Sequence, residues 1–446
     1  MDTPAPLDLS KWRNVPMILI VVGGVLSLIG LAVSREEFAY SWLLAFMFFL
    51  SICLGALFLV IVHHLFDAGW SVPIRRFCEH IATLLQLPML LLFVPIALLA
   101  PKIYPWMMEP KTALDHSLQA KQPLFSTTWF YIVALGCFAI WSLLSNRLRY
   151  WSLKQDTQES SHATAKPGVL QRLLGFNQES PGLIECTFQM RKFSCVGILS
   201  FALTLTLAVV MWMKALEHQW FSTMYGVYYF AGSVWLTLGV VYVITAILDR
   251  QGILSEALHE HQYYFIGSLL FAFTVFYAYV TFAQYFIIWN ANMPEETFWY
   301  VVREQSGWWY VGLVIIFGHF FIPFLALLRI DVKSIFPFMF GIAAWNCLMH
   351  AVDLSFNIMP IPHPHGFPVL WLWLPLGCFA FMGGVLSLIF LKRFAAHAPY
   401  PLKDPRLIEA MGYYHPVPTQ ISGGELEDTD FLRGAPKHLQ RPPHSK

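Results

Sequence analysis

Long apolar stretches alternate with short polar ones along most of the 446-residue chain. Ten stretches lack Asp, Glu, Lys and Arg and approach or exceed the roughly 20 helical residues that cross a bilayer core. These stretches are residues 16–34, 38–65, 81–100, 123–145, 193–213, 218–248, 261–293, 306–328, 334–352 and 354–391. The pattern predicts an all-α membrane protein of about ten transmembrane helices.

The first apolar stretch also has features of a signal peptide, because Lys11 and Arg13 precede it. It is long for such a segment, lacks a small-residue cleavage motif and leads directly into another span. We therefore expect it to be a retained helix.

Polar segments divide the chain into a ten-span membrane domain, residues 1–397, and a polar tail, residues 398–446. A long polar loop, residues 148–192, separates the fourth and fifth spans. If the N-terminus is inside, most of the 28 Lys and Arg residues fall on the inner side. The positive-inside rule then places both termini, the loop and the tail in the cytoplasm.

The composition agrees with a membrane location. The chain is 57% hydrophobic and only 12% charged, whereas about 25% of the residues in a soluble domain are charged. The 17 Trp and 18 Tyr residues are typical of aromatic belts at the two membrane interfaces. The net charge of +1 offers no basic face to a nucleic acid.

The seven cysteines are scattered, and no two form a C-x-x-C pair. This spacing excludes covalent haem attachment through C-x-x-C-H and argues against an iron–sulfur or structural zinc site. We expect the chain to bind no metal and no cofactor. Any electron transfer would then run on partner proteins or on a diffusible carrier.

Ionisable residues gather between the second and third spans. An ionisable side chain at the centre of a membrane helix costs on the order of 2.5–3.5 kcal/mol, so such residues call for an explanation. His64 and Asp67 lie three positions apart, as do Arg76 and Glu79, and each pair could meet on one helix face. Together with His80 they could anchor a helical hairpin through satisfied charges. They could also take up protons or contact a quinone head group.

Further along, His319 stands alone in the eighth span, and His350 and Asp353 share a face in the ninth. A lone histidine in a span is often a packed core residue. A carboxylate beside an imidazole can form a proton relay, because each group shifts the pKa of the other. A structural capping pair fits the same spacing equally well.

Other polar groups have simpler interpretations. Lys214, Glu217 and His218 fit a self-paired group at the outer interface. The histidine pairs at 259 and 261 and at 363 and 365 lack further ligands, so we expect no metal there. The residues alone thus favour a helical membrane subunit with a few buried protonatable groups, either a transporter or a quinone-linked component.

Three stretches carry a more specific signal, and they are residues 55–79, 220–232 and 270–308. The second begins Trp220-Phe221-Ser222-Thr223, and the third includes Asn290-Ala291-Asn292-Met293-Pro294. They resemble the ActF subunit of bacterial alternative complex III, within the NrfD/PsrC-type family of integral membrane proteins. The resemblance covers nearly all of the membrane part.

That resemblance implies two four-helix bundles plus two flanking helices, in a multi-pass protein of the bacterial cytoplasmic (inner) membrane. It implies a quinol:electron-acceptor oxidoreductase complex that delivers electrons to cytochrome c or to an oxygen reductase. The implied partners are a paralogous ten-span quinol-binding subunit, an iron–sulfur subunit, haem c subunits and, in some assemblies, a terminal oxidase. Quinol would be the substrate of the complex, and the haem c and iron–sulfur clusters would lie on partners. This chain would have no activity alone.

For this subunit the resemblance favours a proton path or a scaffold. The implied path residues are His64, Asp67, Glu79 and His80 on the cytoplasmic side, and His319, His350 and Asp353 beyond them. Three positions depart from the polar residues common in the family, namely Met211, Phe265 and Ser268. The path therefore differs in this chain, or the subunit is structural.

Two other functions remain open at this stage. One is a quinol-binding anchor of a molybdenum-type or polysulfide-type reductase, and the other is a secondary transporter. Transporters often carry Gly/Pro-interrupted spans at matching positions of two halves. Pro88, Pro95 and Pro323 do not match in that way.

Overall fold

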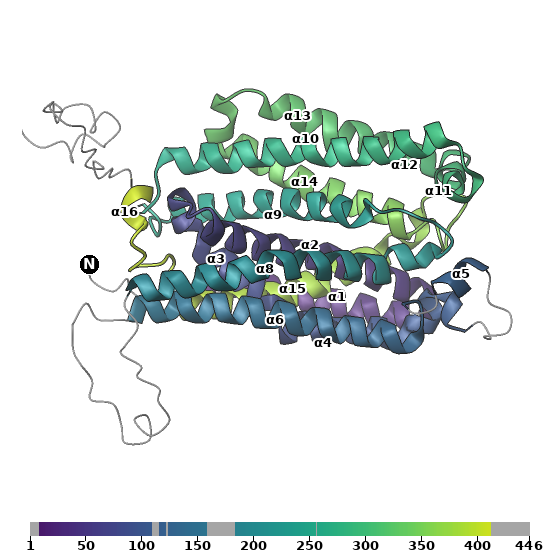
Figure 1. Cartoon of the computed structure of the whole chain (residues 1–446), viewed down its shortest axis with the longest axis horizontal. Helices are drawn as coiled ribbons and strands as arrows, with labels where there is room; N and C mark the ends of the chain where they lie inside the picture. The colour runs from purple at the N-terminus through teal and green to yellow at the C-terminus, as the bar shows by residue number, and fades with distance from the viewer. Residues whose placement is uncertain (1–8, 109–115, 122–123, 158–182, 256, 412–446) are drawn as a thin grey trace, which may run out of the picture.

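The computed structural model describes residues 9–108, 116–121, 124–157, 183–255 and 257–411, and every regular element in these ranges is a helix (Figure 1). Nine helical stretches of the described residues are long and apolar enough to cross a membrane. They are Lys11–Val33, Arg35–Leu65, Gly69–Ile103, Thr127–Thr157, Leu183–Trp212, Tyr225–Arg250, His261–Ala291, Trp308–Leu327 and Val369–Ala395. The set is that of a multi-pass membrane protein.

The α-helices are α1 Asn14–Val33, α2 Arg35–Leu65, α3 Val72–Ala82, α4 Leu87–Ile103, α5 His116–Ala120, α6 Thr127–Thr157, α8 Leu183–Trp212, α9 Tyr225–Arg250, α10 Glu260–Ala291, α11 Pro294–Glu304, α12 Trp308–Ile315, α13 Ile322–Leu327, α14 Phe336–Ile358, α15 Trp373–Ala395 and α16 Leu407–Ala410. The 3₁₀ turns are η1 Ser10–Arg13, η2 Gly69–Ser71, η3 Thr83–Leu85, η4 Pro105–Met107, η5 Lys214–Glu217, η7 Asp331–Ser334 and η8 Val369–Trp371. Between α12 and α13 the segment η6, Ile316–Phe321, is a π-helix.

The predicted ninth span corresponds to α14, which is 23 residues long but is not among the nine apolar stretches. Its sequence includes Asn346, His350, Asp353 and Asn357, and all four side chains are buried. These polar residues lower the hydropathy of the helix. They point into the protein, and α14 packs against α9, α2 and α12.

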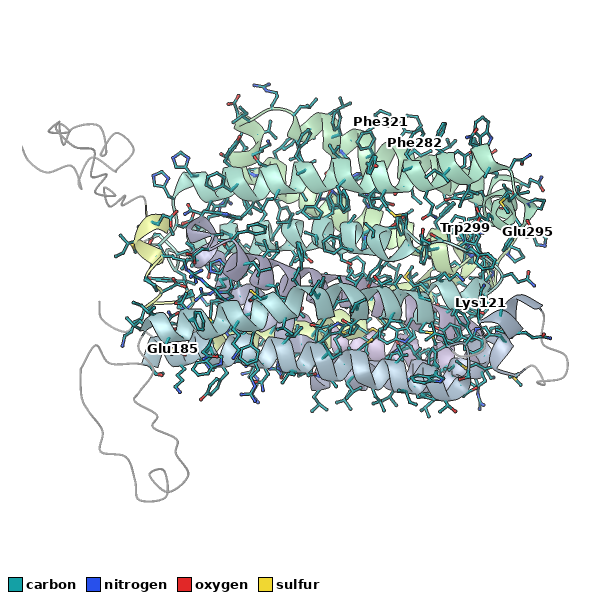
Figure 2. The ribbon with its side chains drawn as sticks, in the orientation of Figure 1. Lys121, Glu185, Phe282, Glu295, Trp299 and Phe321 are labelled. Atoms are coloured by element: carbon teal, nitrogen blue, oxygen red, sulfur yellow. The ribbon has the colours of Figure 1, made fainter. Side chains whose placement is uncertain are left out.

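Helices α2 and α9 form the centre of the molecule. Helix α2 packs against α9, α15, α8 and α4, and α9 packs against α10 and α14 as well (Figure 1). Both are more buried than the other spans, which fits their almost uniformly apolar or small residues. Helices on the outside keep one face for lipid: Phe282 of α10 and Phe321 of η6 are 65% and 42% exposed (Figure 2).

Helices α1 and α15 approach closely because glycines line their contact. A Cβ atom on Gly384 would lie 2.7 Å from the carbonyl oxygen of Pro16. Small residues at such a contact let two membrane helices approach backbone to backbone. The predicted retained helix at the start of the chain is therefore part of the packed bundle.

Helices extend into both the polar loop and the polar tail that the sequence predicted. Helix α6 continues to Thr157 and α8 begins at Leu183, so only the middle of the predicted 148–192 loop lies outside the described residues. Of the predicted tail, residues 398–411 pack across one end of the bundle, where α16 contacts η2 and α3. Residues 412–446 lie outside the described part.

The two ends of the bundle carry different elements (Figure 1). One end holds α16, the beginning of α3 and Glu185 of α8, and the other holds α5, α11, Lys121 and Glu295 (Figures 1 and 2). We call these the α16 end and the α11 end. The polar residues singled out in the sequence are divided between the α16 end and the interior of the bundle.

Candidate functional site: two buried polar clusters

A stripe of polar residues follows one face of α14. Asn346, His350, Asp353 and Asn357 are spaced four, three and four residues apart, which keeps them on the same helix face. All four are at most 4% exposed. The stripe extends about 17 Å along the helix, at a rise of about 1.5 Å per residue. It places the predicted His350–Asp353 face inside the protein.

The structure brings His319 to this stripe. One ligand-type atom from each of His319, His350 and Asp353 lies within 4.8 Å of the others, and all three side chains are buried. We call these three residues the central cluster. Sequence reasoning singled out all three residues, but only folding brings α14 and η6 together to place His319 beside the pair.

Two tyrosines hold the carboxylate of Asp353. The hydroxyl of Tyr277 donates to Asp353 Oδ1 at 2.7 Å, and the hydroxyl of Tyr228 donates to the same oxygen. Hydrogen bonds to the charged form stabilise a carboxylate that has no cation beside it. Neither tyrosine was named as a candidate site residue, although Tyr228 lies in the stretch 220–232 and Tyr277 in the stretch 270–308 that carry the resemblance.

His319 lies in an aromatic sandwich. Its ring centroid is 3.9 Å from that of Trp235 and 3.8 Å from that of Tyr277, both nearly parallel. The π-helical segment η6 carries it, and such segments often mark functional sites. Neither of its ring nitrogens has a hydrogen-bond partner among the described residues. The sandwich fixes the ring while leaving both nitrogens, which lie in its plane, available.

His350 is held from the other side of the cluster. Its Nε2 lies 3.1 Å from Ser51 Oγ on α2, while its Nδ1 has no partner in the described chain. Its ring lies against Gly232 of α9, where a Cβ atom would come within 2.9 Å of the imidazole Cε1. The glycine makes room for the imidazole between α9 and α14.

Hydrogen bonds continue from the cluster toward the α11 end. Asn357 Nδ2 donates to the hydroxyl oxygen of Tyr228 at 2.9 Å, and Asn357 Oδ1 accepts from the hydroxyl of Tyr225 at 2.9 Å. Arg303 is a charged neighbour of Tyr225. The arginine pairs with Glu217 at 3.2 Å, and the side chain of Glu217 is 21% exposed. Hydrogen bonds thus run from Asp353 to Tyr225, and only the nearby charge of Arg303 relates Tyr225 to the partly exposed Glu217.

Arg303 belongs to α11. Its guanidinium lies 3.6 Å from the centroid of the Trp299 ring and donates to the backbone carbonyls of Trp299 and Phe356. Burial lowers the pKa of Arg303, and Glu217 opposes that effect. The predicted self-pairing of Lys214, Glu217 and His218 is therefore wrong for Glu217, whose partner is Arg303.

The second group of polar residues lies at the α16 end. Arg75 Nε pairs with Glu79 at 3.1 Å, and Arg76 Nη1 pairs with the same carboxylate at 3.3 Å. Arg75 also pairs with Asp404, and Arg76 pairs with Asp156. We call these five residues, with His63, His64 and His80, the end cluster. The predicted pairing of Arg76 with Glu79 is confirmed.

Asp404 comes from the segment after α15 and completes the end cluster. Burial alone would raise the pKa of this carboxyl, but Arg75 and Arg406 outweigh that effect and hold the pKa well below its usual range. Its side chain is fully buried against Arg75. Sequence reasoning missed Asp404, because nothing local shows that a polar tail will fold back onto α3.

The expected contact between His64 and Asp67 does not form. Helix α2 ends at Leu65, and Asp67 has φ 53°, a left-handed conformation outside the helix. Its carboxylate instead pairs with Arg191 at 2.5 Å and with Arg406 at 2.8 Å. The three-residue spacing predicted a shared helix face only if the helix continued, and it does not.

The histidines of the end cluster differ in their partners. His63 Nε2 lies 3.0 Å from Arg75 Nη1, and its Nδ1 lies 2.5 Å from Ser71 Oγ. Because a guanidinium can only donate, Nε2 accepts and Nδ1 carries the hydrogen. His64 and His80 are buried without a hydrogen-bond partner in the described part of the chain. Beside His80, His397 has its pKa lowered by burial.

The two clusters are separated. Ser51, which contacts His350, and His63 are 12 positions apart on α2, or about 18 Å along the helix axis. No residue of α2 between them is a hydrogen-bonding polar side chain, apart from the thiol of Cys53. The candidate residues therefore form two polar regions, and α2 links them only through an apolar stretch.

The three departures from the family pattern have ordinary surroundings. Met211 is buried in the core, and Phe265 packs against Trp70 with ring centroids 5.6 Å apart. Ser268 Oγ accepts from Lys333 Nζ at 3.4 Å. A lysine from η7 therefore reaches Ser268.

The central cluster is also the one group of three metal-type ligands among the described residues. A divalent cation there would meet only one carboxylate, and that carboxylate already accepts from two tyrosines. Two imidazoles and one carboxylate are also a common donor set for a divalent metal. The geometry of the central cluster is therefore compatible with a proton relay or with a metal ion.

Comparison with known proteins gives no further guide to function. No protein-family model matches the chain, and no curated protein matches it.

Proposed function

We propose that this chain is a cofactor-free membrane subunit of a quinol:electron-acceptor oxidoreductase complex, of the kind that its resemblance to the ActF subunit implies. In that complex it supplies a proton path beside the quinol-oxidising subunit. Helix α14 would be its tenth span, within two four-helix bundles flanked by α1 and α15. Both termini would face the cytoplasm, and the iron–sulfur and haem c subunits would meet the α11 end.

One observation carries this proposal. A carboxylate and two imidazoles meet inside an apolar bundle, and hydrogen bonds continue from that carboxylate to Tyr225, near the ion pair of Arg303 with the partly exposed Glu217. Ionisable groups within a membrane are costly, and they mark proton relays and ion pathways. A scaffold alone would be built more stably from apolar residues.

The chemistry assigned to these residues is proton exchange. Asp353 would exchange a proton with His350 or His319. The hydrogen bonds of Tyr225, Asn357 and Tyr228 all donate in the direction of Asp353. Before a proton could leave toward the α11 end, the two hydroxyls would have to rotate and water would have to carry the proton past the Asn357 amide. Each of these hydroxyl and amide groups has both a donor and an acceptor. The unpaired nitrogens of His319 and His350 and the amide of Asn346 would bind water, which needs two to four polar partners in such a site.

On the cytoplasmic side, His64, Glu79 and His80 would take up protons, and Asp67 would lie at the rim. The apolar stretch of α2 then requires either water entry during turnover or a conformational step between the two clusters. This requirement makes the path two half-paths rather than one continuous chain of hydrogen bonds.

The test is proton release by the purified complex in liposomes during quinol oxidation, measured together with turnover. Asp353→Asn keeps the size of the side chain and should reduce proton release per electron while the protein stays assembled. Asp331→Asn is the matched control, since Asp331 forms an ion pair whose two side chains are each 75% exposed. Full turnover and unchanged proton release in Asp353→Asn would leave only a scaffold role.

The same preparation distinguishes the other functions. Co-purification with haem c and iron–sulfur proteins supports the proposed complex. A molybdopterin-containing partner would instead support the quinol-binding anchor of a molybdenum-type or polysulfide-type reductase. Solute uptake by the isolated chain in liposomes would support a secondary transporter.

A further inference from the structure

A cavity of about 500 Å³ lies at the α16 end, outside the central cluster. It lies where α2 ends and α3 begins, and α9 and α10 form its other side. Its apolar walls include Leu59, Phe66, Trp70, Leu238, Phe265 and Leu269. Phe66 and Phe265 are 77% and 39% exposed, so this side of the cavity faces the surface of the bundle. Its volume falls in the range of about 300–1,000 Å³ that is usual for small-molecule sites.

The polar groups on the inner side of the cavity already have partners. His63, Ser71 and Arg75 line it, and they are joined to one another by hydrogen bonds. The guanidinium of Arg75 also pairs with Asp404 and Glu79. No other Lys or Arg lines the cavity among the described residues. Ser268 also lines the cavity, and its Oγ accepts from Lys333 Nζ at 3.4 Å. The polar groups of the interior are therefore few and already paired, which fits an apolar chain.

The rim of the cavity is charged. Asp67 lies between the lining residues Phe66 and Ala68, and its side chain is 48% exposed. The carboxylate of Glu409, also an exposed residue, lies directly against the Cα of Gly69, between Ala68 and Trp70. Arg191, with 44% of its side chain exposed, pairs with Asp67. Arg406, with 8% of its side chain exposed, pairs with Asp67 as well. The rim thus holds two carboxylates and two guanidiniums, and both guanidiniums pair with Asp67.

The charges at the rim determine which lipid head group can bind there. An anionic head would meet as many carboxylates as cations, whereas anionic lipids are recognised by clusters of Lys and Arg without such carboxylates. A head that carries both a phosphate and a primary ammonium can pair its phosphate with Arg191, the more exposed guanidinium, and its ammonium with Glu409. Such charge-assisted hydrogen bonds are the strong ones.

We infer that this cavity binds one acyl chain of a zwitterionic phospholipid whose head group carries a primary ammonium. The chain lies between α2, η2, α9 and α10, and the head lies at the rim formed by Asp67, Glu409 and Arg191. The cavity shares no residue with the central cluster, but its lining residues His63 and Arg75 belong to the end cluster and Asp67 lies at the rim of the proposed cytoplasmic half-path. The tests below measure bound lipid and not proton release, so the two proposals can fail separately.

The first test measures the lipid retained by the full chain, purified in mild detergent with whatever proteins accompany it. Lipids are extracted and quantified by mass spectrometry. Leu269→Trp fills the cavity and should abolish retention of the ammonium phospholipid. Leu203→Trp is the matched control, because Leu203 is 67% exposed on α8 and lines no part of the cavity. Retention by Leu269→Trp equal to that of Leu203→Trp would overturn the inference.

The second test addresses the head group and uses an exposed residue, so that loss of folding is not the cause of a change. Protein stripped of lipid is titrated with nanodiscs that contain either an ammonium phospholipid or an anionic one. Glu409→Gln should lower the preference for the ammonium lipid about tenfold, the effect of losing one charged hydrogen bond. Asp331→Asn should leave it unchanged. A retained quinone, or a preference for the anionic lipid in the wild type, would contradict the inference.

Discussion

Lys214 is buried between aromatic rings, although lysine side chains are usually exposed to solvent. Its ammonium lies 5.5 Å from the ring centroids of both Phe125 and Phe221, and the residue is only 7% exposed. Burial, and then the neighbouring ammonium of Lys121, lower its pKa to about 7. In the unfolded chain a lysine keeps a pKa near 10.4. Protonation of Lys214 therefore opposes folding.

The sign of the resulting pH dependence follows from proton binding. Between pH 7 and about pH 10 the unfolded chain binds more protons than the folded one, so stability rises with pH across that window. We expect the wild type to melt at a higher temperature at pH 9.5 than at pH 7. The free energy of unfolding should rise by about 2 kcal/mol between these two pH values, once partial solvation of the lysine is taken into account. Lys214→Met should flatten the dependence in a thermal melt in detergent, and Lys11→Met, at an exposed position, should not.

At the same scale, sequence reasoning found the chemistry but not all of its geometry. The spacing of His350 and Asp353 predicted a shared face, and they share one. The same spacing rule continues to Asn346 and Asn357, which could have been included. Tyr228 and Tyr277 could not, since only the folded contact distinguishes a tyrosine that donates to a carboxylate from one that packs. The prediction for Asp67 was wrong because it assumed that α2 continues to this residue, whereas the helix ends at Leu65.

The contact between α1 and α15 provides a test at the scale of elements. A Cβ atom on Gly23 would clash with the backbone nitrogen of Phe381, whereas one on Gly24 would come no closer than 3.4 Å, to a ring carbon of the same residue. Gly23→Ala should therefore separate the helices, because backbone atoms cannot move aside as a side chain can. We expect Gly23→Ala to lower the melting temperature by several degrees and Gly24→Ala to have little effect. Equal effects would show that the two helices do not pack as described.

The segment after α15 is also an element that can be tested. Asp404 compensates Arg75, and breaking a buried ion pair costs about 3–5 kcal/mol because one charge is left unpaired. We expect Asp404→Asn to lower the melting temperature strongly, while Asp331→Asn, at an exposed ion pair, leaves it nearly unchanged. Since the pKa of Asp404 is depressed by folding, its contribution is full above the unfolded pKa near 4 and is lost as pH falls through the folded value. The melting temperature of Asp404→Asn should thus approach that of the wild type in acid.

Element boundaries were the less predictable part of the fold. The apolar stretches located the spans, because hydrocarbon requires a long apolar helix. They did not predict that α6 and α8 would continue past the apolar region, where Gln155 and Thr187 hydrogen-bond to each other. They also could not show that α16 folds back, because a contact between residues more than 300 positions apart leaves no local pattern.

For the whole molecule, orientation in the membrane is the property to be measured. Glu185 and Glu295 are exposed and lie at opposite ends of the bundle (Figure 2). In a cysteine-free background, we expect Glu295→Cys to react with a membrane-impermeant thiol reagent added to intact cells. Glu185→Cys should react only after the membrane is opened. The reverse result would place the α16 end outside and would contradict the positive-inside assignment.

The apolar stretch of α2 between Ser51 and His63 has an electrical consequence. If the proposed path fills with water on both sides of this stretch, each polar region takes the potential of the aqueous phase next to it, and most of the transmembrane voltage then falls across the stretch. Moving one proton through it would then cost or yield nearly the full electrical work, about 2.3 kcal/mol per 100 mV. Nearly the whole transmembrane electric field would in this way act on this short apolar segment of α2.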